Sequence, residues 1–271
     1  MKVIFFGSDG IREIVWNLKE NFDLALVVST KESLISYCKE LNLPYTYSIN
    51  VSRDLIEKVK ELKPDLGVVA SYGAILPKEL IDIFPKGMIN VHPSLLPKFR
   101  GPTPVQTAIL EGEKETGVTF IKLDEKMDHG PILYQKKYEI KKTDSGENLI
   151  RYLFEISAPA LIDTIKHLDD IKEEVQDDSQ ATFTKMLTKQ DGYIDLNNIP
   201  TKDKLDRMIR AYAFWPGVWT KFDINGNGVE KIIKIFPDEI IQVEGKKTMK
   251  FKDFINGYKN GSEFLEKLGL S

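Results

Sequence analysis

The sequence lacks the features on which several classes of protein depend. Its single cysteine, Cys38, cannot form an internal disulfide, which excludes a small disulfide-stabilised secreted domain. No apolar run approaches the roughly 18 residues that suggest a membrane-spanning helix. Residue 1 leads into a strand-like run, without the basic and then apolar segments of a secretory leader. We therefore expect a cytoplasmic protein.

A strong net charge and a set of metal ligands are also missing. The 38 lysines and arginines stand against 41 aspartates and glutamates, a net charge of −3, which argues against a uniformly basic nucleic-acid-binding protein. Residues 201–271 carry a net charge of +3 and the remainder −6, which points the C-terminal part toward anionic partners. With three histidines, one cysteine and no His-Glu-x-x-His sequence, we expect no metal site.

The first half of the chain alternates short apolar runs with amphipathic stretches. This pattern is typical of βαβ units, in which helices cover both faces of a parallel sheet. We therefore predict an α/β fold with a Rossmann-like, mostly parallel sheet. The predicted strands span residues 2–6, 24–29, 66–70, 88–91 and 118–123, and the predicted helices span residues 11–20, 31–41, 53–62, 103–111 and 145–167.

The composition changes toward the C-terminus. Residues 169–178 are acidic and poor in apolar side chains, so we expect them at the surface. A short helix over residues 202–210 is followed by three predicted strands and by turns rich in Asn, Gly and Asp. These strands span residues 218–224, 232–236 and 240–243. We therefore predict two domains, an α/β domain over residues 1–200 and a small β-rich domain over residues 201–271.

Three polar side chains are the candidates for chemistry. Asn90 and His92 stand two residues apart at the end of an apolar strand, so they face the same side of the sheet. The carboxyl ends of parallel strands are where open α/β sheets bind ligands. Asp128 lies in a polar loop after the predicted strand over residues 118–123, and we expect it to reach the same crevice.

An amide, an imidazole and a carboxylate in one crevice suit acyl transfer to an amine. The amide donor can stabilise a tetrahedral oxyanion, and the imidazole, paired with the carboxylate, can move the proton that the amine loses. An acyl donor that is already activated requires no serine or cysteine nucleophile. The rigid segment Pro93–Pro102 follows directly and is expected to hold its shape, because it combines three prolines with a turn glycine.

The sequence contains several motifs in and around these residues. They are Asn90-Val91-His92-Pro93-Ser94-Leu95-Leu96-Pro97, Arg100-Gly101, Glu115-Thr116-Gly117-Val118-Thr119, Leu123-Asp124, Asp128-His129-Gly130 and Ser71-Tyr72-Gly73-Ala74-Ile75-Leu76-Pro77. Together they resemble the N10-formyltetrahydrofolate-dependent formyltransferases. The resemblance implies that Asn90, His92 and Asp128 are catalytic and that N10-formyltetrahydrofolate is the co-substrate. It also implies a folate pocket lined by Tyr72, Gly73, Ile75, Leu76, Pro77, Leu123 and Asp124, and acceptor contacts from Ser94, Arg100 and Gly101.

The later segments are most similar to the methionyl-tRNA branch of that family. They are residues 181–192, Arg210-Ala211, Trp215-Pro216-Gly217 and residues 244–249. In that branch a basic loop that enters the tRNA follows the second strand, whereas residues 29–33 here lead directly into a helix. Only about 54 residues follow Gly217, too few for the family's full OB-type barrel. The similarity of these later segments makes charged initiator tRNA the first candidate acceptor. A nucleotide-linked amino sugar is the alternative candidate, because sugar N-formyltransferases often lack both the basic loop and the full barrel.

Two further hypotheses use the same residues. A folate-binding module without catalysis is expected to have lost one of the three catalytic side chains, and all three are present. A hydrolase that releases formate from the folate would need no acceptor. The sequence does not indicate an oligomeric state.

Overall fold

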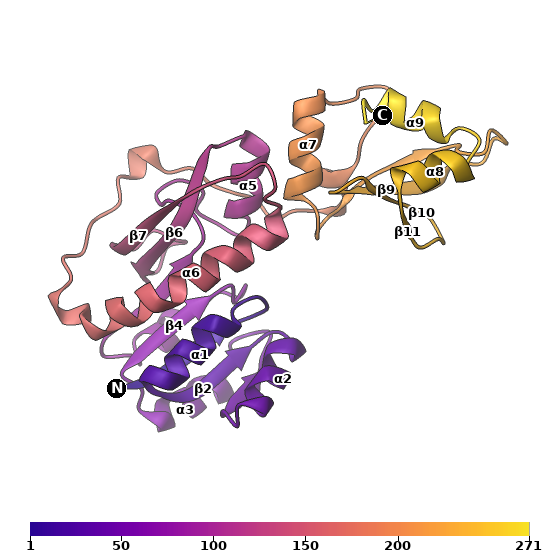
Figure 1. Cartoon of the computed structure of the whole chain (residues 1–271). Helices are drawn as coiled ribbons and strands as arrows, with labels where there is room; N and C mark the ends of the chain where they lie inside the picture. The colour runs from indigo at the N-terminus through magenta and orange to yellow at the C-terminus, as the bar shows by residue number, and fades with distance from the viewer. Residues whose placement is uncertain (271) are drawn as a thin grey trace. The chain divides into compact units, whose positions relative to one another are not determined.

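A seven-stranded sheet organises the N-terminal part of the chain in the computed structural model, which describes residues 1–270 (Figure 1). The strand order is β3-β2-β1-β4-β5-β6-β7. The five strands from β3 to β5 are parallel to their neighbours, whereas β6 runs antiparallel to β5 and β7 antiparallel to β6. The strands are β1 (Lys2–Gly7), β2 (Asp23–Ser29), β3 (Tyr45–Tyr47), β4 (Leu66–Ala70), β5 (Met88–His92), β6 (Glu115–Lys122) and β7 (Ile132–Glu139).

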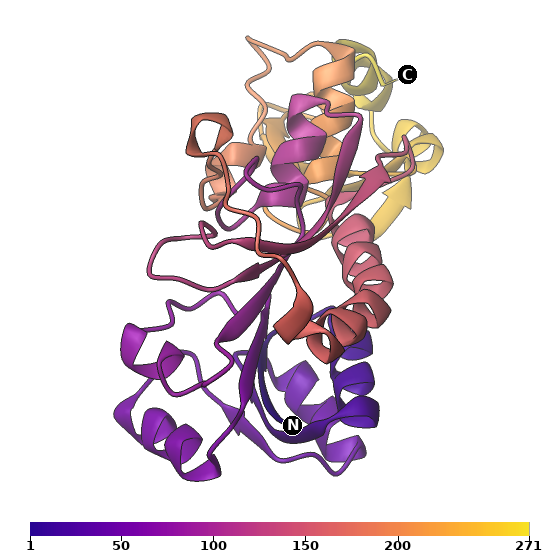
Figure 2. The ribbon, with the colours of Figure 1, turned by 90° about the vertical axis from the view of Figure 1, so that its left-hand side faces the viewer.

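Helices cover both faces of this sheet. Alternate residues of β1 pack in opposite directions: Val3 and Phe5 join one buried cluster, and Ile4 and Phe6 join the other. The first cluster takes side chains from α1 (Arg12–Asn21), α2 (Glu32–Glu40) and α6 (Gly146–Lys166), and the second from α3 (Arg53–Leu62) and α4 (Lys78–Ile81). Figure 2 shows α1 and α6 on one side of the sheet and α3 on the other. Burial on both faces explains why the parallel strands are continuously apolar.

The lone thiol belongs to the core. Cys38 lies in the first buried cluster and has no solvent exposure. Burial raises the pKa of this thiol to about 11, so it stays protonated and behaves as a small apolar side chain.

The chain divides into two compact units. Unit 1 comprises Met1–Pro104, Glu115–Glu139 and Ile150–Thr184, and unit 2 comprises Val105–Lys114, Ile140–Leu149 and Lys185–Ser271. Unit 1 holds the seven-stranded sheet and unit 2 holds a four-stranded antiparallel sheet of order β11-β10-β9-β8. The predicted domain boundary at residue 200 stays a prediction.

One face of the small sheet is buried and the other is exposed. Ile233, Ile235 and Ile241 are buried, whereas the intervening Lys234 is exposed. Helices α7 and α8 contact this sheet, and α9 contacts α8. The remaining elements are α5 (Pro104–Glu111), α7 (Lys202–Ala211), β8 (Val218–Phe222), β9 (Lys231–Phe236), β10 (Ile240–Val243), β11 (Thr248–Lys250), α8 (Phe251–Gly257) and α9 (Gly261–Lys267), with short 3-10 turns at Leu168–Asp170, Asp178–Gln180 and Lys189–Gly192.

The structure confirms the α/β fold with a mostly parallel sheet, and it corrects one strand. The strand predicted at residues 118–123 is β6, and it pairs antiparallel with β5 rather than parallel as in a βαβ unit. A parallel crossover needs a helix that packs back on the sheet between the two strands. The helix between β5 and β6 is α5, and its residues 105–111 belong to unit 2 rather than to the unit of the sheet. None of the helices in residues 1–270 is long and apolar enough to cross a bilayer.

Phe120 provides a test of this core. Its side chain is fully buried on β6, and its ring stacks on Tyr134 at a centroid distance of 4.9 Å. We expect Phe120→Ala to lower the free energy of unfolding by about 3–5 kcal/mol, because it removes apolar burial and leaves a cavity. Urea unfolding measures this. The control Phe214→Ala removes a ring that is 79% exposed and should change stability by less than about 0.5 kcal/mol. Equal effects of the two substitutions would contradict the packing described.

Candidate active site

The pleat of β5 directs alternate side chains to opposite faces of the sheet. Ile89 and Val91 pack into the cluster beneath α1 and α6, so Asn90 and His92 lie on the opposite face of the strand. His92 is 4% exposed and is the last residue of β5. The two polar side chains therefore stand together at the carboxyl end of a parallel strand.

Asp128 reaches them from a loop that follows an antiparallel strand. Lys122 at the end of β6 lies opposite Ile89, and the Leu123 amide then donates to the Met88 carbonyl at 2.8 Å. The loop over residues 123–131 returns along β5 from there. At Asp128 the backbone has φ = 48°, a left-handed conformation that is uncommon for a residue with a side chain.

The carboxylate of Asp128 connects two segments. Its Oδ1 accepts a hydrogen bond from Asn90 Nδ2 at 3.1 Å and lies 3.6 Å from His92 Nδ1. Its Oδ2 accepts a hydrogen bond from the backbone amide of Gly101 at 2.8 Å. The structure thus brings together the three side chains that the sequence singles out as catalytic.

The other nitrogen of His92 faces a carbonyl. His92 Nε2 lies 3.0 Å from the carbonyl oxygen of Phe99, and a carbonyl can only accept. The neutral ring therefore carries its hydrogen on Nε2. This leaves Nδ1, on the side of Asp128, unprotonated in the neutral form and able to take a proton.

The three residues expected to contact the acceptor lie in the segment after β5. Ser94 is fully buried, and its hydroxyl donates to the Lys98 carbonyl at 2.8 Å. Arg100 is 3% exposed, and its guanidinium donates to Gln176 and Asp178. Gly101 has φ = 110°, and a Cβ there would lie 2.9 Å from the backbone oxygen of Thr184. All three hold the segment in place, and their contacts with an acceptor stay predictions.

The residues expected to line a folate pocket lie in two loops of unit 1. Residues 71–77 follow β4, and Leu123 and Asp124 follow β6. Leu76 and Leu123 pack against the buried cluster on the α3 side, which is the face to which Asn90 and His92 point, while Ile75 is 92% exposed. Gly73 has φ = 76° and Pro77 precedes α4. Their role in binding folate stays a prediction.

Two polar members of this group have partners in the structure. The hydroxyl of Tyr72 donates to the Ser48 carbonyl at 3.2 Å, and burial raises the pKa of this phenol, so it stays protonated. Asp124 Oδ2 lies 2.6 Å from His129 Nδ1. Among residues 1–270, no group of three or more His, Cys, Asp and Glu side chains is placed to hold a metal ion.

Sequence reasoning missed Gln176. It lies in the stretch that we expected at the surface, yet it is 7% exposed and contacts Arg100 as well as the loop of Asp128. The only signal in the sequence is one neutral amide, Gln176, within a run of acidic side chains.

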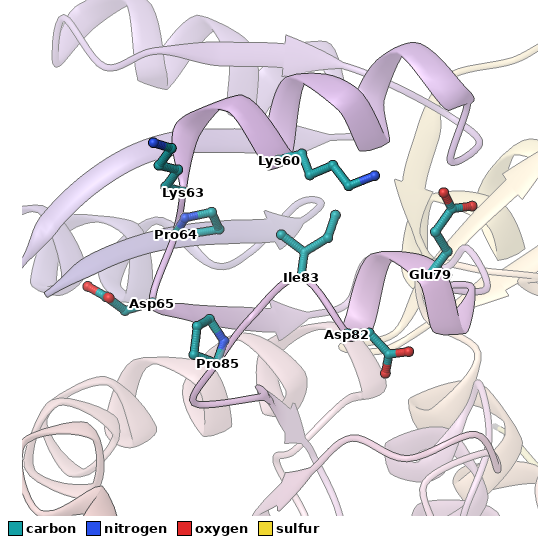
Figure 3. A pocket seen from close by; sticks show the side chains of 8 residues that line it. All are labelled: Lys60, Lys63, Pro64, Asp65, Glu79, Asp82, Ile83 and Pro85. Atoms are coloured by element: carbon teal, nitrogen blue, oxygen red, sulfur yellow. The ribbon is translucent and has the colours of Figure 1, made fainter.

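A hollow of about 550 Å³ lies elsewhere in unit 1 (Figure 3). Pro64 and Asp65 precede β4 and Pro85 precedes β5, so the hollow is at the amino ends of these strands. Its charged side chains are of both signs, with Lys60 and Lys63 opposite Glu79 and Asp82. It is therefore at the opposite edge of the sheet from His92.

Comparison with known families and proteins connects the site to one group. Residues 11–165 match the formyl transferase family. A methionyl-tRNA formyltransferase from Caldicellulosiruptor saccharolyticus is 31% identical over 307 residues, which covers 96% of this chain and 97% of that protein. A protein of the same name from Roseiflexus sp. is 44% identical over 167 residues, which covers 61% of this chain and 51% of that protein. The chain thus spans about half the length of several relatives that it matches.

Solved structures share the fold at low sequence identity. A sugar N-formyltransferase from Shewanella sp. has a TM-score of 0.66 and 22% identity, covering 85% of this chain and 95% of that one. A methionyl-tRNA formyltransferase from Clostridium thermocellum has a TM-score of 0.64 and 19% identity, covering 92% of this chain and 99% of that one. Proteins with two kinds of acceptor in their names therefore share this fold.

The protonation pattern of the histidines can be measured directly. We expect the nitrogen NMR spectrum of neutral His92 to show hydrogen on Nε2 and not on Nδ1, because Nε2 faces the Phe99 carbonyl. His129 should carry hydrogen on Nδ1, which lies 2.6 Å from the Asp124 carboxylate, whether or not Nε2, 3.4 Å from Asp178, also carries one. Hydrogen on Nδ1 of neutral His92 would contradict the proton-accepting role of that atom.

Proposed function

The chain belongs to the formyl transferase family and is a formyl-transferring enzyme, and we propose that it transfers the formyl group from N10-formyltetrahydrofolate to the amino group of methionyl-tRNA. One observation carries the proposal: the amide of Asn90, the imidazole of His92 and the carboxylate of Asp128 meet at the end of β5. This set can polarise a carbonyl and move a proton without forming a covalent enzyme intermediate.

Asn90 provides the oxyanion donor. A side-chain amide has two hydrogens, and one of them is used in the bond to Asp128. The second is available for the formyl oxygen, which becomes negatively charged when the amine attacks its carbon. Because the donor is already held in place, it needs no reorganisation as the charge develops.

His92 moves the proton. The amine forms a C–N bond to the formyl carbon and must lose one proton, which Nδ1 of His92 accepts. The nearby carboxylate of Asp128 stabilises the resulting imidazolium, at a distance of 3.6 Å in the structure. The bond from the formyl carbon to N10 then breaks, and the same proton passes to the departing nitrogen, so charge and atoms balance.

The loops after β4 and β6 fit a folate donor. They supply apolar side chains on the face of Asn90 and His92, and the exposed Ile75 leaves apolar surface available to a flat ring. The folate supplies the activated formyl group when it is bound. Tyr72 stays neutral and keeps residues 71–77 attached to residue 48.

The choice of acceptor rests on sequence similarity along the whole chain. The Caldicellulosiruptor relative, named a methionyl-tRNA formyltransferase, aligns over nearly all of both proteins. One observation favours a nucleotide-linked amino sugar instead: β2 ends at Ser29 and α2 begins at Glu32, which leaves no room for a long basic loop. A sugar acceptor needs only a pocket, whereas tRNA needs a basic surface.

Substitutions of the three side chains test the mechanism. We expect Asn90→Asp to reduce turnover by about 10²–10³-fold, because it replaces an oxyanion donor with a negative charge. His92→Asn should reduce turnover because it removes the proton acceptor. Steady-state kinetics with N10-formyltetrahydrofolate measures both.

Coupling between His92 and Asp128 provides the control for this mechanism. If the two act as a unit, the double variant His92→Asn/Asp128→Asn should be much faster than the product of the single effects implies. Turnover near the wild-type value in Asn90→Asp or His92→Asn would contradict the proposed roles.

Salt dependence distinguishes the two acceptors. With charged initiator tRNA, kcat/KM should fall steeply as salt rises, with a log–log slope of roughly 0.7–0.9 for each phosphate contacted. Candidate contacts are Lys246, Lys247, Lys250 and Lys252, of which Lys246 and Lys247 lie exposed in the turn between β10 and β11. Lys250 also donates to the Asp238 carbonyl at 2.7 Å. Lys246→Gln/Lys247→Gln should reduce the slope by about one to two units.

A matched pair of lysines and a second substrate complete this test. Lys60→Gln/Lys63→Gln removes the same charge beside the hollow in unit 1 and should leave the slope unchanged. A flat salt profile with efficient formylation of a nucleotide-linked amino sugar would overturn the tRNA proposal in favour of the sugar. Formate release that is independent of any acceptor would instead identify a hydrolase.

A further inference from the structure

The amide of Gln176 joins two parts of unit 1 through four hydrogen bonds. Its Oε1 accepts from Nε and Nη2 of Arg100 at 3.1 and 2.9 Å. Its Nε2 donates to the carbonyls of Asp128 and Gly130 at 2.9 and 2.7 Å. The hydrogen-bonding capacity of this buried side chain is therefore fully used. A fully satisfied buried network of this kind fixes the groups that it contacts.

Arg100 is itself firmly held, so it provides a rigid support. Its backbone amide donates to the Thr182 carbonyl at 2.9 Å, and its carbonyl accepts from the Thr184 amide at 2.8 Å. Its guanidinium also donates to Asp178 at 2.8 Å. Asp178 in turn lies 3.4 Å from His129, the residue after Asp128. The family resemblance implies that Arg100 contacts the acceptor, and in the structure its guanidinium contacts Gln176 and Asp178.

The loop that Gln176 contacts needs such support. Asp128 has φ = 48°, a left-handed conformation that Asp adopts more readily than most residues but that still costs free energy and persists where surrounding contacts maintain it. Gln176 contacts the carbonyl of this residue and that of Gly130, two residues later. These two bonds thus contact the backbone at and just after the residue whose carboxylate meets Asn90 and Gly101.

We propose that Gln176 is a positioning residue that holds Asp128 in its working conformation, with Arg100 fixing the amide from the other side. The inference rests on the proposed catalytic role of Asp128. Only a side-chain amide can accept from the guanidinium and donate to two carbonyls through one planar group. A glutamate at this position would still accept from Arg100 but would direct a negative oxygen at the two carbonyls.

Two variants separate the two sides of the amide. Gln176→Glu keeps the size of the side chain and the bonds from Arg100 but removes both donated bonds. Gln176→Met removes all four. The matched control is Gln180→Glu, since Gln180 is exposed and its side-chain amide donates to Asp177 at 2.8 Å. The thermal midpoint and circular dichroism of each variant report whether the fold is retained.

Hydrogen exchange at Gly101 gives a readout that needs no acceptor. The Gly101 amide donates to the Asp128 carboxylate, so displacement of this carboxylate exposes the amide hydrogen to solvent. We expect the Gly101 amide to exchange its hydrogen faster in Gln176→Glu and Gln176→Met than in the wild type. In Gln180→Glu its exchange rate should be unchanged. Wild-type protection in Gln176→Glu would overturn the inference, whether or not Gln176→Met folds.

Kinetics then test whether the displacement matters for the reaction. We expect kcat of Gln176→Glu to fall by about 10²-fold, a size typical of a misplacement of about 1 Å, with KM for the folate little changed. In an Asp128→Asn background, Gln176→Glu should have no further effect on kcat. A full additional loss there, or a wild-type kcat in the single variant, would overturn the positioning role. Wild-type turnover in Asp128→Asn alone would instead refute the proposed mechanism.

Discussion

The carboxylate of Asp128 is the interaction on which the site depends. One oxygen accepts a hydrogen bond from the Asn90 amide and lies beside His92, and the other accepts a hydrogen bond from the backbone amide of Gly101. These contacts connect the loop after β6 with the end of β5 and with the segment that follows β5. Hydrogen bonds to an ionised carboxylate are among the stronger ones in proteins. The arrangement therefore fixes the geometry of the site.

The sheet supplies the framework for this contact. Burial on both faces makes the parallel strands rigid, and the pleat of β5 directs Asn90 and His92 out of the cluster that takes Val91. The third component is the segment from residue 176 to residue 184, which packs along residues 97–101 through backbone bonds to Arg100 and Pro97. The site is thus assembled from contacts across about ninety residues of sequence within one unit. Such a site is held by tertiary packing rather than by any local motif.

The proposed catalytic groups and the lysines proposed to contact tRNA lie in different units of the chain. The groups that would transfer the formyl unit all belong to unit 1. The lysines that would meet a polyanion belong to unit 2, on a sheet with one buried and one exposed face. Relatives named for tRNA and for sugar acceptors share the fold, which is expected when the same transfer is combined with different acceptor surfaces.

The sequence alone determined the features that depend on local periodicity and residue type. Amphipathic periodicity gave the bounds of α3, and apolar runs gave those of β4 and β10, as observed. The two-residue spacing of Asn90 and His92 placed them on one face. The short strands β3 and β11 and the largely exposed β7 lack such runs, so they were not predicted. An apolar strand also has the same pattern in either direction, so only the tertiary structure decided that β6 is antiparallel. Likewise, only the structure revealed that His92 Nε2 faces the Phe99 carbonyl and that Arg100 donates to Gln176, 76 residues away. Such hydrogen bonds depend on how the chain packs and leave no periodic signal in the sequence.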